Sequence, residues 1–271
     1  MDNQTTEQMW SSASAYESYV GRWSRLVARE FVKWLRVPAG KTWLDVGCGT
    51  GALTETIFET AAPRYVVGAD QSKAYVEYLR HRLKDPRLCF DVSDVQDLNF
   101  NDEFYDNSVS GLCLNFAPDP LKGMTEIVRV TKPGGIVAAY VWDYAGEMQL
   151  MRHFWNAAVQ LDPAARELDE SVRFAICKPE PLAGLARASG LEDVETRAID
   201  IALVLRDFED YWAPFLGGQG SAPNYFVSLS EERRDALRDR IRSTLPIAAD
   251  GSISLVARAW AVRGTRVWRV H

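Results

Sequence analysis

Several features that mark other protein classes are missing from this sequence of 271 residues. No two of its four cysteines are close enough in sequence to form a CxxC pair, which excludes that redox or zinc motif. The three histidines are widely separated, so the sequence shows no metal-ligand set and we expect no metal cofactor. Unpaired thiols are typical of the reducing cytoplasm. The cysteines are Cys48, Cys89, Cys113 and Cys177.

Long apolar runs and excess positive charge are also missing. No run of 18 apolar residues is present, so no membrane span is expected. The first ten residues are polar and acidic, unlike a secretory signal. The net charge is −6, whereas a duplex nucleic-acid binder usually carries a basic face that displaces counterions. We therefore expect a soluble, cytoplasmic protein without a nucleic-acid partner, and the sequence leaves its oligomeric state open.

The spacing of apolar residues predicts alternating strands and helices over the first half of the chain. Strands are expected at 42–46, 65–69, 87–92, 109–114 and 136–142, and helices at 16–35, 52–61, 72–84 and 121–131. This alternation predicts an α/β fold with a Rossmann-like, doubly wound, mostly parallel sheet. Ligands of such sheets bind beyond the carboxyl ends of the strands. Those ends are marked by Gly47, Asp70, Asp94, Asn115 and Asp143.

The pattern changes after residue 142. Helices are expected at 147–161 and 179–189, and a late antiparallel strand pair at 194–205 and 253–262. We expect a single domain over 1–271, with an N-terminal helical cover (1–36), a cofactor-binding core (37–142) and a remainder (143–271). An inserted helical cap at about 206–250 separates the last two strands, and so long an insertion usually has a use. Its aromatic residues either belong to a lid over the substrate or anchor a peripheral helix to the sheet.

The strongest local signal is the glycine loop Leu44–Gly51, with the sequence LDVGCGTG. Its glycines let the backbone turn sharply and approach a ligand closely, and the helix that follows offers unpaired N–H groups. A dinucleotide suits this loop, because Gly47, Gly49 and Ala52 satisfy G-x-G-x-x-G/A and Asp70 stands near the position of a ribose acid. S-adenosylmethionine is also compatible with this loop, because its amino-acid and ribose portions can pack closely against the loop backbone. The loop alone leaves both cofactors open.

Five motifs in order resemble the class I methyltransferase family, specifically its small-molecule, methyltransferase type 11-like branch. The likeness covers roughly residues 16–142 and continues more loosely to the end of the chain. The chain departs from the family at Asn115, where a His or an aromatic residue is frequent. The five motifs are LDVGCGTG at 44–51, VVGADQS at 66–72, DVQDLNF at 94–100 (similar to D-A-x-x-L-P-F), FYD at 104–106 before the fourth strand, and RVTKPGG at 129–135.

The resemblance implies a methyltransferase that uses S-adenosylmethionine and releases S-adenosylhomocysteine. The methyl acceptor would be an O, N or C atom of a small molecule. The resemblance also implies that Asp70 accepts hydrogen bonds from both ribose hydroxyls, since a carboxylate has two acceptor oxygens. Asp94 would accept from the adenine amine and the Val95 N–H would donate to the ring, with Asp91 and Asp97 as alternative contacts. The other cofactor-binding candidates are Tyr19, Asp45, Gly47, Gly49, Gln71 and Asn115.

Methyl transfer asks little of the protein, because the sulfonium already activates the methyl group and alignment supplies much of the acceleration. A base is needed only where the acceptor must lose a proton early. The candidates for this base are His153, Asp143 and Glu147. Aromatic residues are candidates for binding the acceptor, with core packing as the alternative. These are Tyr16, Trp23, Trp142, Trp212 and Phe215.

Other functions stay open at this point. An NAD-dependent oxidoreductase would need a hydride-transfer group such as a Tyr-x-x-x-Lys pair, and the sequence contains none. A non-catalytic S-adenosylmethionine-binding protein would share the fold, and only a turnover assay separates it from an enzyme. Methylation of tRNA or protein is disfavoured by the acidic charge. The arginines at 233–242 follow Glu231 and Glu232, which is typical of a solvated helix face.

Overall fold

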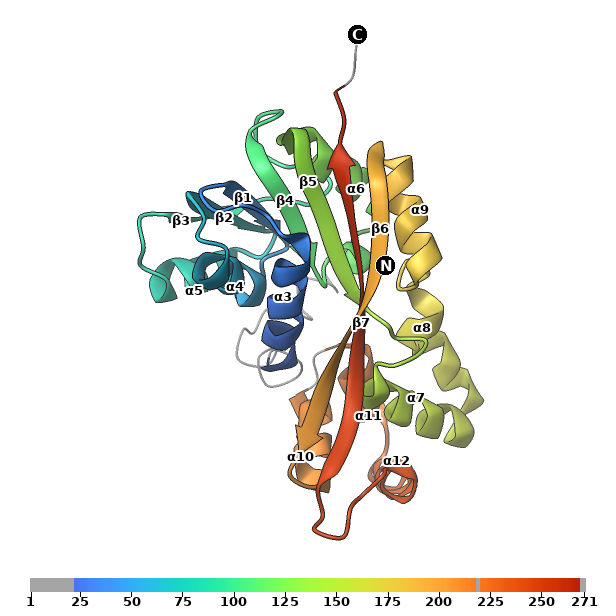
Figure 1. The fold of residues 1–271 in the computed structure, drawn as a ribbon. Helices are drawn as coiled ribbons and strands as arrows, with labels where there is room; N and C mark the ends of the chain where they lie inside the picture. Colours follow the sequence, from blue (N-terminus) through green and yellow to red (C-terminus); the bar gives the residue numbers. More distant parts are fainter. Residues whose placement is uncertain (1–21, 218–219, 269–271) are drawn as a thin grey trace.

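The computed structural model describes residues 22–217 and 220–268 (Figure 1). Within these residues, one sheet of seven strands has the order β3-β2-β1-β4-β5-β7-β6. The strands are β1 (Thr42–Val46), β2 (Tyr65–Asp70), β3 (Leu88–Val92), β4 (Tyr105–Gly111), β5 (Thr131–Trp142), β6 (Leu191–Leu205) and β7 (Ile253–Arg266). The helices are α3 (Arg22–Leu35), α4 (Ala52–Thr60), α5 (Lys73–Arg82), α6 (Pro120–Val130), α7 (Gln149–Leu161), α8 (Glu170–Arg173), α9 (Pro179–Ala188), α10 (Phe208–Trp212), α11 (Ser221–Ser228) and α12 (Glu231–Thr244).

The direction of the strands confirms the predicted sheet. β3, β2, β1, β4 and β5 pair in parallel, as expected of strands joined by helical crossovers. β7 inserts between β5 and β6 and runs antiparallel to both, so the late pair is antiparallel as predicted. The order of the strands reverses beside β1, and the carboxyl ends of β1 and β4 therefore flank the crevice where doubly wound sheets bind their ligands.

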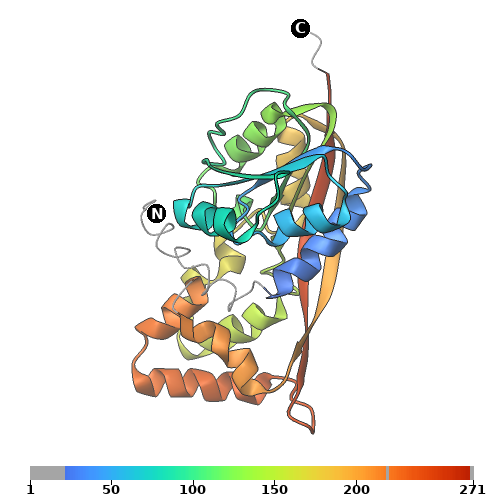
Figure 2. The ribbon, with the colours of Figure 1, turned by 90° about the vertical axis from the view of Figure 1, so that its left-hand side faces the viewer.

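Helices cover both faces of the sheet. α3 packs against α4 and on β6 and β7, whereas α6 and α9 pack against each other and on the other face, as Figures 1 and 2 show. The inner side of α3 buries Val27, Phe31 and Leu35, which repeat at helical spacing and are at most 1% exposed. These residues belong to one hydrophobic core that also contains the buried side chains of β1, β4 and β5.

The fourth strand begins four residues earlier than the apolar pattern predicts. We expected it at 109–114, after an FYD motif, but β4 starts at Tyr105 and ends at Gly111. Its first half carries the polar residues Asn107 and Ser108, which are nonetheless buried. The hydroxyl of Thr131 donates a hydrogen bond of 2.7 Å to Ser108 Oγ, so this polarity is satisfied inside the sheet. Hydrophobicity alone therefore placed the strand too late.

The fifth strand likewise begins before its apolar stretch. We expected it at 136–142, after a KPGG stop signal, but β5 begins at Thr131 and the turn residues lie within it. Gly135 occupies a crowded position there, because a Cβ on it would stand 2.4 Å from the carbonyl oxygen of Asp106. Lys132 donates a hydrogen bond of 2.8 Å to the Asp106 carboxylate, which ties this start of β5 to β4.

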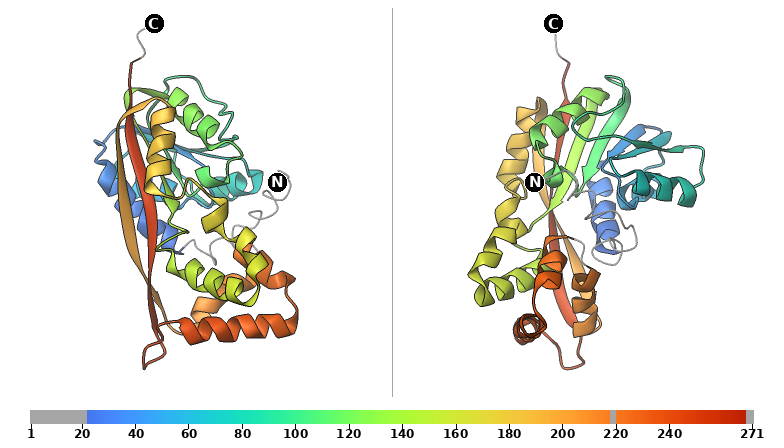
Figure 3. Two further views of the ribbon diagram at one scale, coloured as in Figure 1. Left: turned by 90° about the vertical axis from the view of Figure 1, so that its right-hand side faces the viewer. Right: turned by 180° about the vertical axis from the view of Figure 1, so that it is seen from behind.

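The last two strands extend well beyond the rest of the sheet. β6 and β7 pair from Leu191 opposite Arg266 to Leu205 opposite Ile253, and Figure 1 shows them as a twisted ribbon that reaches α10–α12. Together with α7, these helices form a second lobe below the sheet, and α8 lies between the two lobes (Figures 2 and 3). The segment 206–250 thus forms a helical unit at the end of the ribbon. No helix within the described residues is long and apolar enough to cross a membrane.

Candidate active site

The glycine loop after β1 needs its glycines for two different reasons. Gly47 has a φ of 75° and Gly49 one of 51°, a region that favours glycine. A Cβ on Gly47 would stand 2.3 Å from Cys113 Sγ, so the loop passes directly beneath the end of β4. A Cβ on Gly49 would meet no atom within 4 Å, because this position faces an open cavity. The loop thus presents bare backbone to that cavity.

The cavity lies beyond the carboxyl ends of the strands and has a volume of about 1000 Å³. It is lined both by strand-end residues of the sheet and by residues of α7, α8 and α11 in the second lobe. Seven of the nine predicted cofactor-binding residues lie on its wall: Gly47, Gly49, Asp70, Gln71, Asp94, Val95 and Asn115. Asp45 lies beneath the glycine loop instead, and Tyr19 lies outside the described residues.

Asp70 stands at the end of β2, where it faces the glycine loop. Its two carboxylate oxygens accept hydrogen bonds from Gly49 N at 2.9 Å and Ser72 N at 2.8 Å. Burial raises the pKa of Asp70 above its ordinary value, and these two amides act against the rise. Each carboxylate oxygen has a second lone pair, so Asp70 can still accept from a ligand on the cavity side.

The structure distinguishes between Asp91, Asp94 and Asp97, the three candidate adenine contacts near the end of β3. Asp94 and Val95 line the cavity, together with Ser93 and Gln96, which the sequence analysis did not single out. Asp94 accepts a hydrogen bond of 2.8 Å from Gln96 N, which fixes the turn. Asp91 and Asp97 are exposed and are not part of the cavity wall. Of the three, Asp94 is therefore the one placed to meet a ligand.

Asn115 carries a donor that no protein group satisfies. Its side chain is 7% exposed and lines the cavity from the short 3₁₀ turn Leu114–Phe116 after β4. The Nδ2 atom is buried and has no hydrogen-bond partner within the described part of the chain. A buried amide without a partner is costly, so this donor favours a bound group that offers an acceptor.

Asp45 supports the loop from below. It is fully buried, and Thr54 Oγ1 donates a hydrogen bond of 2.6 Å to its Oδ2 atom. Burial raises the pKa of Asp45 to about 7, and the charge of Asp70 adds to this rise. The carboxyl of Asp45 thus joins the loop to the start of α4 without reaching the cavity.

The other half of the cavity is largely aromatic and apolar. The ring of Phe174 packs edge-on against Phe116 at 5.1 Å and lies 5.8 Å from Tyr144. Met148 and Met151 add flexible apolar surface from α7 and the turn before it. Trp142, a predicted substrate residue, is also on this wall, as is Tyr225 of α11. The polar groups in this half are those of Glu170, Arg173, Ser221, Asn224 and Ser228.

The three predicted base candidates do not line the cavity. Asp143 is buried, and its two oxygens accept hydrogen bonds from the amides of Gly146 and Glu147, both at 3.0 Å. It therefore shapes the turn after β5. Glu147 accepts a hydrogen bond from Gln149 at 2.8 Å. His153 is half-buried in α7, and desolvation lowers its pKa. The base candidates that follow β5 in sequence are thus held in local structure.

The aromatic residues predicted for the cap lie in the core rather than on the cavity wall. Trp212 is 4% exposed and stacks with Phe208 at 5.9 Å, and Phe215 is fully buried and stacks with Phe154 at 4.6 Å. The cap reaches the cavity through α11 instead. Trp23 is 3% exposed and packs in the core, while Tyr16 lies outside the described residues.

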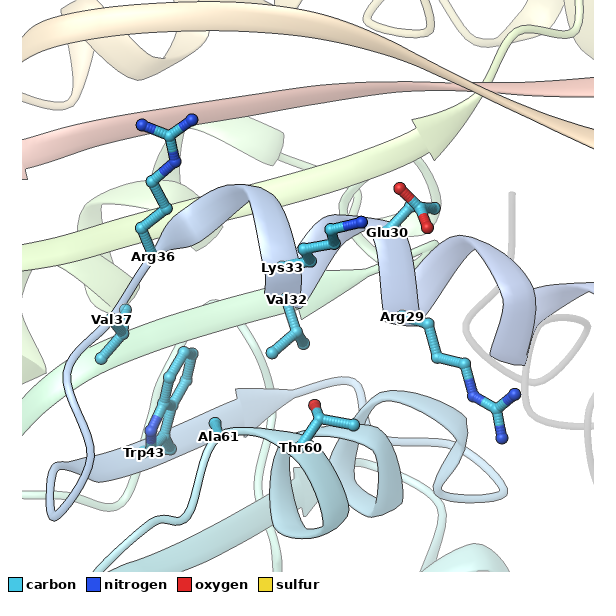
Figure 4. A pocket seen from close by; sticks show the side chains of 9 residues that line it. All are labelled: Arg29, Glu30, Val32, Lys33, Arg36, Val37, Trp43, Thr60 and Ala61. Atoms are coloured by element: carbon cyan, nitrogen blue, oxygen red, sulfur yellow. The ribbon is translucent and has the colours of Figure 1, made fainter.

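A second hollow of about 430 Å³ lies between α3, the start of β1 and the end of α4 (Figure 4). Val32, Trp43 and Ala61 face it, but the guanidinium groups of Arg29 and Arg36 point away from it and from each other. No predicted site residue lines it. The described residues also contain no group of three or more His, Cys, Asp or Glu side chains that could hold a metal ion.

Comparisons with known proteins agree on one family. A family model described as a methyltransferase domain matches residues 44–139. The demethylmenaquinone methyltransferase of Clavibacter sepedonicus is 31% identical over 61% of this chain and 71% of the relative. The chain belongs to the class I S-adenosylmethionine-dependent methyltransferases.

Two further similarities extend this result. The 2-phytyl-1,4-naphtoquinone methyltransferase of Nostoc punctiforme is 32% identical over 40% of the chain, which spans about half (49%) of that relative. A solved structure of Haemonchus contortus phosphoethanolamine N-methyltransferase 2 in complex with S-adenosyl-L-methionine is 18% identical. Its fold matches with a TM-score of 0.59 over 98% of this chain and 58% of that chain.

Family membership decides between the two cofactors that the glycine loop left open. The protein is a methyltransferase enzyme that uses S-adenosylmethionine rather than NAD. Several residues on the cavity wall were missed by the sequence analysis, above all Glu170, Arg173 and Tyr225. They lie in the second half of the chain, where neither a motif nor a strand end marks a residue as part of a site.

Proposed function

We propose that this methyltransferase transfers a methyl group to a flat, largely apolar aromatic small molecule, which binds in the second half of the cavity. The observation that carries the proposal is the continuity of one cavity of about 1000 Å³ from the strand ends to α7, α8 and α11. Ligand pockets commonly measure about 300–1000 Å³, so this cavity has room for a cofactor and an acceptor side by side.

The residues at the strand ends fit the cofactor. Asp70 accepts from the ribose hydroxyls, and Asp94 with the Val95 amide binds the adenine edge. The bare backbone at Gly49 lets the methionine part approach, since nothing lies within 4 Å of a Cβ built there. The unpartnered amide of Asn115 donates to the carboxylate of the methionine part. When bound, S-adenosylmethionine supplies a methyl group already activated by its sulfonium.

Two independent features support an aromatic acceptor. The wall formed by Phe116, Trp142, Tyr144 and Phe174 offers ring faces and edges for stacking. The relatives from Clavibacter sepedonicus and Nostoc punctiforme are named for menaquinone-type and naphthoquinone-type acceptors. Such a molecule is a flat bicyclic system that is fully aromatic in its reduced, quinol form. A quinol-like ring thus suits both the wall and the relatives.

The protein contributes mainly alignment and the exclusion of water. The acceptor is held between α7, α8 and α11, so that its reacting atom faces the strand ends where the cofactor binds. Holding two reactants at near-attack distance supplies a large part of the rate acceleration of a displacement reaction. The hydrogen bond from Arg173 Nη1 to Ser221 Oγ, 2.5 Å long, joins α8 to α11 across the acceptor half.

The proposal is tested by calorimetry and a methyl-transfer assay on the same preparation. We expect binding of S-adenosylmethionine and S-adenosylhomocysteine but not of NAD, and transfer of labelled methyl from S-adenosylmethionine to 1,4-naphthohydroquinone or an aromatic amine. The variant Phe174→Ala should raise KM for the aromatic acceptor at least several-fold while leaving S-adenosylhomocysteine affinity unchanged. Transfer to aliphatic acceptors alone would contradict the proposal, as would equal loss of both affinities in the variant.

A further inference from the structure

A single carboxyl group lies in the acceptor half of the cavity, that of Glu170 at the start of α8. Its side chain is 5% exposed. Trp155 Nε1 donates a hydrogen bond of 2.5 Å to its Oε2 atom, and within the described residues no other side chain donates to it. An ionisable group that is buried beside a cavity and only partly hydrogen-bonded is a candidate for chemistry. The indole of Trp155 and the backbone N–H of Glu170 fix its position, and a carboxylate, with about four lone-pair sites, can still accept a proton from a ligand.

We propose that Glu170 removes the proton of an aromatic hydroxyl group on the acceptor as the methyl group is transferred. This inference rests on the proposed function and adds a substrate class, a phenol or hydroquinone, and a catalytic residue to it. The O–H bond breaks and its proton moves to the Glu170 carboxylate. The electron pair left on the acceptor forms the new bond to the methyl carbon, either from the oxygen or from a conjugated ring carbon. In the second case the methylated carbon then releases its own hydrogen as a proton to solvent, and the oxygen regains the proton held by Glu170, which restores the aromatic ring. The methyl–sulfur bond breaks with its electron pair left on sulfur.

The surroundings of Glu170 suit a proton acceptor near neutral pH. Burial raises the pKa of Glu170 to about 7. The backbone N–H of Glu170, the Trp155 N–H and the charge of Arg173 oppose this rise, while the neighbouring Asp169 adds to it. Cys177 also lies nearby: burial raises the pKa of its thiol, and the charges of Asp143 and Glu170 add to that rise. Asp169 is itself paired with Arg152 at 2.6 Å. A base whose pKa lies near the working pH is partly ionised and still basic enough to remove a proton.

Arg173 favours a hydroxyl acceptor over an amine. Its guanidinium lies over the ring of Phe174, 5.3 Å from the ring centre, and lines the same half of the cavity. A fixed positive charge stabilises the oxyanion that develops as a phenol loses its proton, whereas it repels an ammonium group. The aromatic wall, the carboxylate and the guanidinium together match a ring that carries an acidic hydroxyl.

The test compares the wild type with Glu170→Gln, which keeps an oxygen to accept the Trp155 N–H but cannot take a proton. The control is Glu167→Gln, an exposed residue in the same segment. With 1,4-naphthohydroquinone, kept reduced, as acceptor, we expect kcat of Glu170→Gln to fall by about 100- to 10,000-fold. KM for the acceptor and the Kd for S-adenosylhomocysteine should change little. The wild-type kcat should fall as the pH drops below about 7, a limb that the variant lacks.

Acceptor acidity gives a second readout that a purely structural role would not affect. The loss in Glu170→Gln should be smaller for 4-nitrocatechol, whose hydroxyl ionises without help. Glu170→Asp, which keeps an ionisable group, should retain the acid limb, and it serves as the test variant if Glu170→Gln does not fold. Equal kcat in wild type and Glu170→Gln on the hydroquinone would overturn the assignment of the residue. Methylation of aromatic amines but not of hydroxyl probes would overturn the substrate class and leave the proposed function standing.

Discussion

Asp70 combines two demands at one residue. It fixes the glycine loop by accepting from Gly49 N and Ser72 N, and it faces the cavity where the ribose of the cofactor is proposed to bind. Asp70→Ala should weaken S-adenosylhomocysteine binding by about 2–4 kcal/mol, the scale of two charge-assisted hydrogen bonds. Isothermal calorimetry measures this loss. Asp91→Ala, a change at an exposed acid outside the cavity, is the matched control and should bind normally. Unchanged affinity in folded Asp70→Ala would place the ribose elsewhere.

The burial of Asp45 makes the free energy of unfolding fall as the pH rises. Its pKa rises from 3.8 to about 7 on folding, so between about pH 4 and pH 7 the folded protein holds a proton that the unfolded chain has released. The stability linked to this group is fully present below about pH 4 and is lost as the pH rises towards 7. The buried Oδ1 atom has no hydrogen-bond partner within the described residues, which is consistent with a protonated carboxyl.

The variant Asp45→Asn removes this dependence while keeping an oxygen that can accept from the Thr54 hydroxyl. We expect the difference in unfolding free energy between variant and wild type to shift in favour of the variant between pH 5 and pH 8. Urea unfolding at the two pH values measures it. Asp239→Asn, an exposed position on α12, controls for the general effect of losing a negative charge. A difference that is the same at both pH values would show that Asp45 is ionised in the folded state.

At the scale of elements, the cap (about 206–250) contributes to the cavity wall through α11 and is anchored in the core by α10 and the turn after it. Trp212 and Phe215 hold α10 and the turn after it in the core, and Tyr211 donates a hydrogen bond of 2.8 Å to the carbonyl of Leu150 on α7. Among the described residues of this segment, those of α11 and Gly220 just before it are the ones that line the cavity. In this segment Trp212 and Phe215 therefore serve packing, whereas Tyr225 of α11 lines the cavity.

Trp212→Ala distinguishes an anchoring residue from a lid residue. We expect a loss of about 3–5 kcal/mol in unfolding free energy, as for other buried aromatic residues truncated to alanine, because the ring packs on Phe208 and Phe226. KM for an aromatic acceptor and the affinity for S-adenosylhomocysteine should stay near the wild-type values at a temperature where the variant is folded. Chemical denaturation and steady-state kinetics measure the two effects. Impaired acceptor kinetics with normal stability would restore the lid hypothesis.

The two halves of the cavity differ in how much of them the sequence could predict. The cofactor half is built from strand ends, where a local pattern of glycines and acids already identifies Gly47, Asp70 and Asp94. The start of β4 was misplaced because buried polar residues in a strand carry no apolar signal. Glu170 was missed because its burial beside the cavity depends on tertiary contacts. Trp155 donates a hydrogen bond to its carboxyl, and Arg173 of α8 donates one to Ser221 of α11. Such contacts join segments that no spacing rule connects.

For the whole molecule, the long β6–β7 ribbon positions the lobe that we propose binds the acceptor. It carries the second lobe below the carboxyl ends of the parallel strands (Figures 2 and 3). One cavity is lined by residues of both parts. In the proposed function, the strand ends of the sheet bind the cofactor and the second lobe supplies the surface that selects the acceptor. Changes to α8 and α11 should accordingly alter acceptor choice without altering cofactor affinity.

The most direct test of this arrangement is a crystal structure of the protein with S-adenosylhomocysteine bound. We expect the ribose hydroxyls to bind Asp70, the adenine to bind Asp94 and Val95, and the homocysteine end to lie against Gly49 and Asn115. We also expect the sulfur atom to face the space between Phe174 and Glu170. Density for the product in the hollow beside Trp43, or a sulfur atom that points away from α8 and α11, would contradict the proposed placement of cofactor and acceptor.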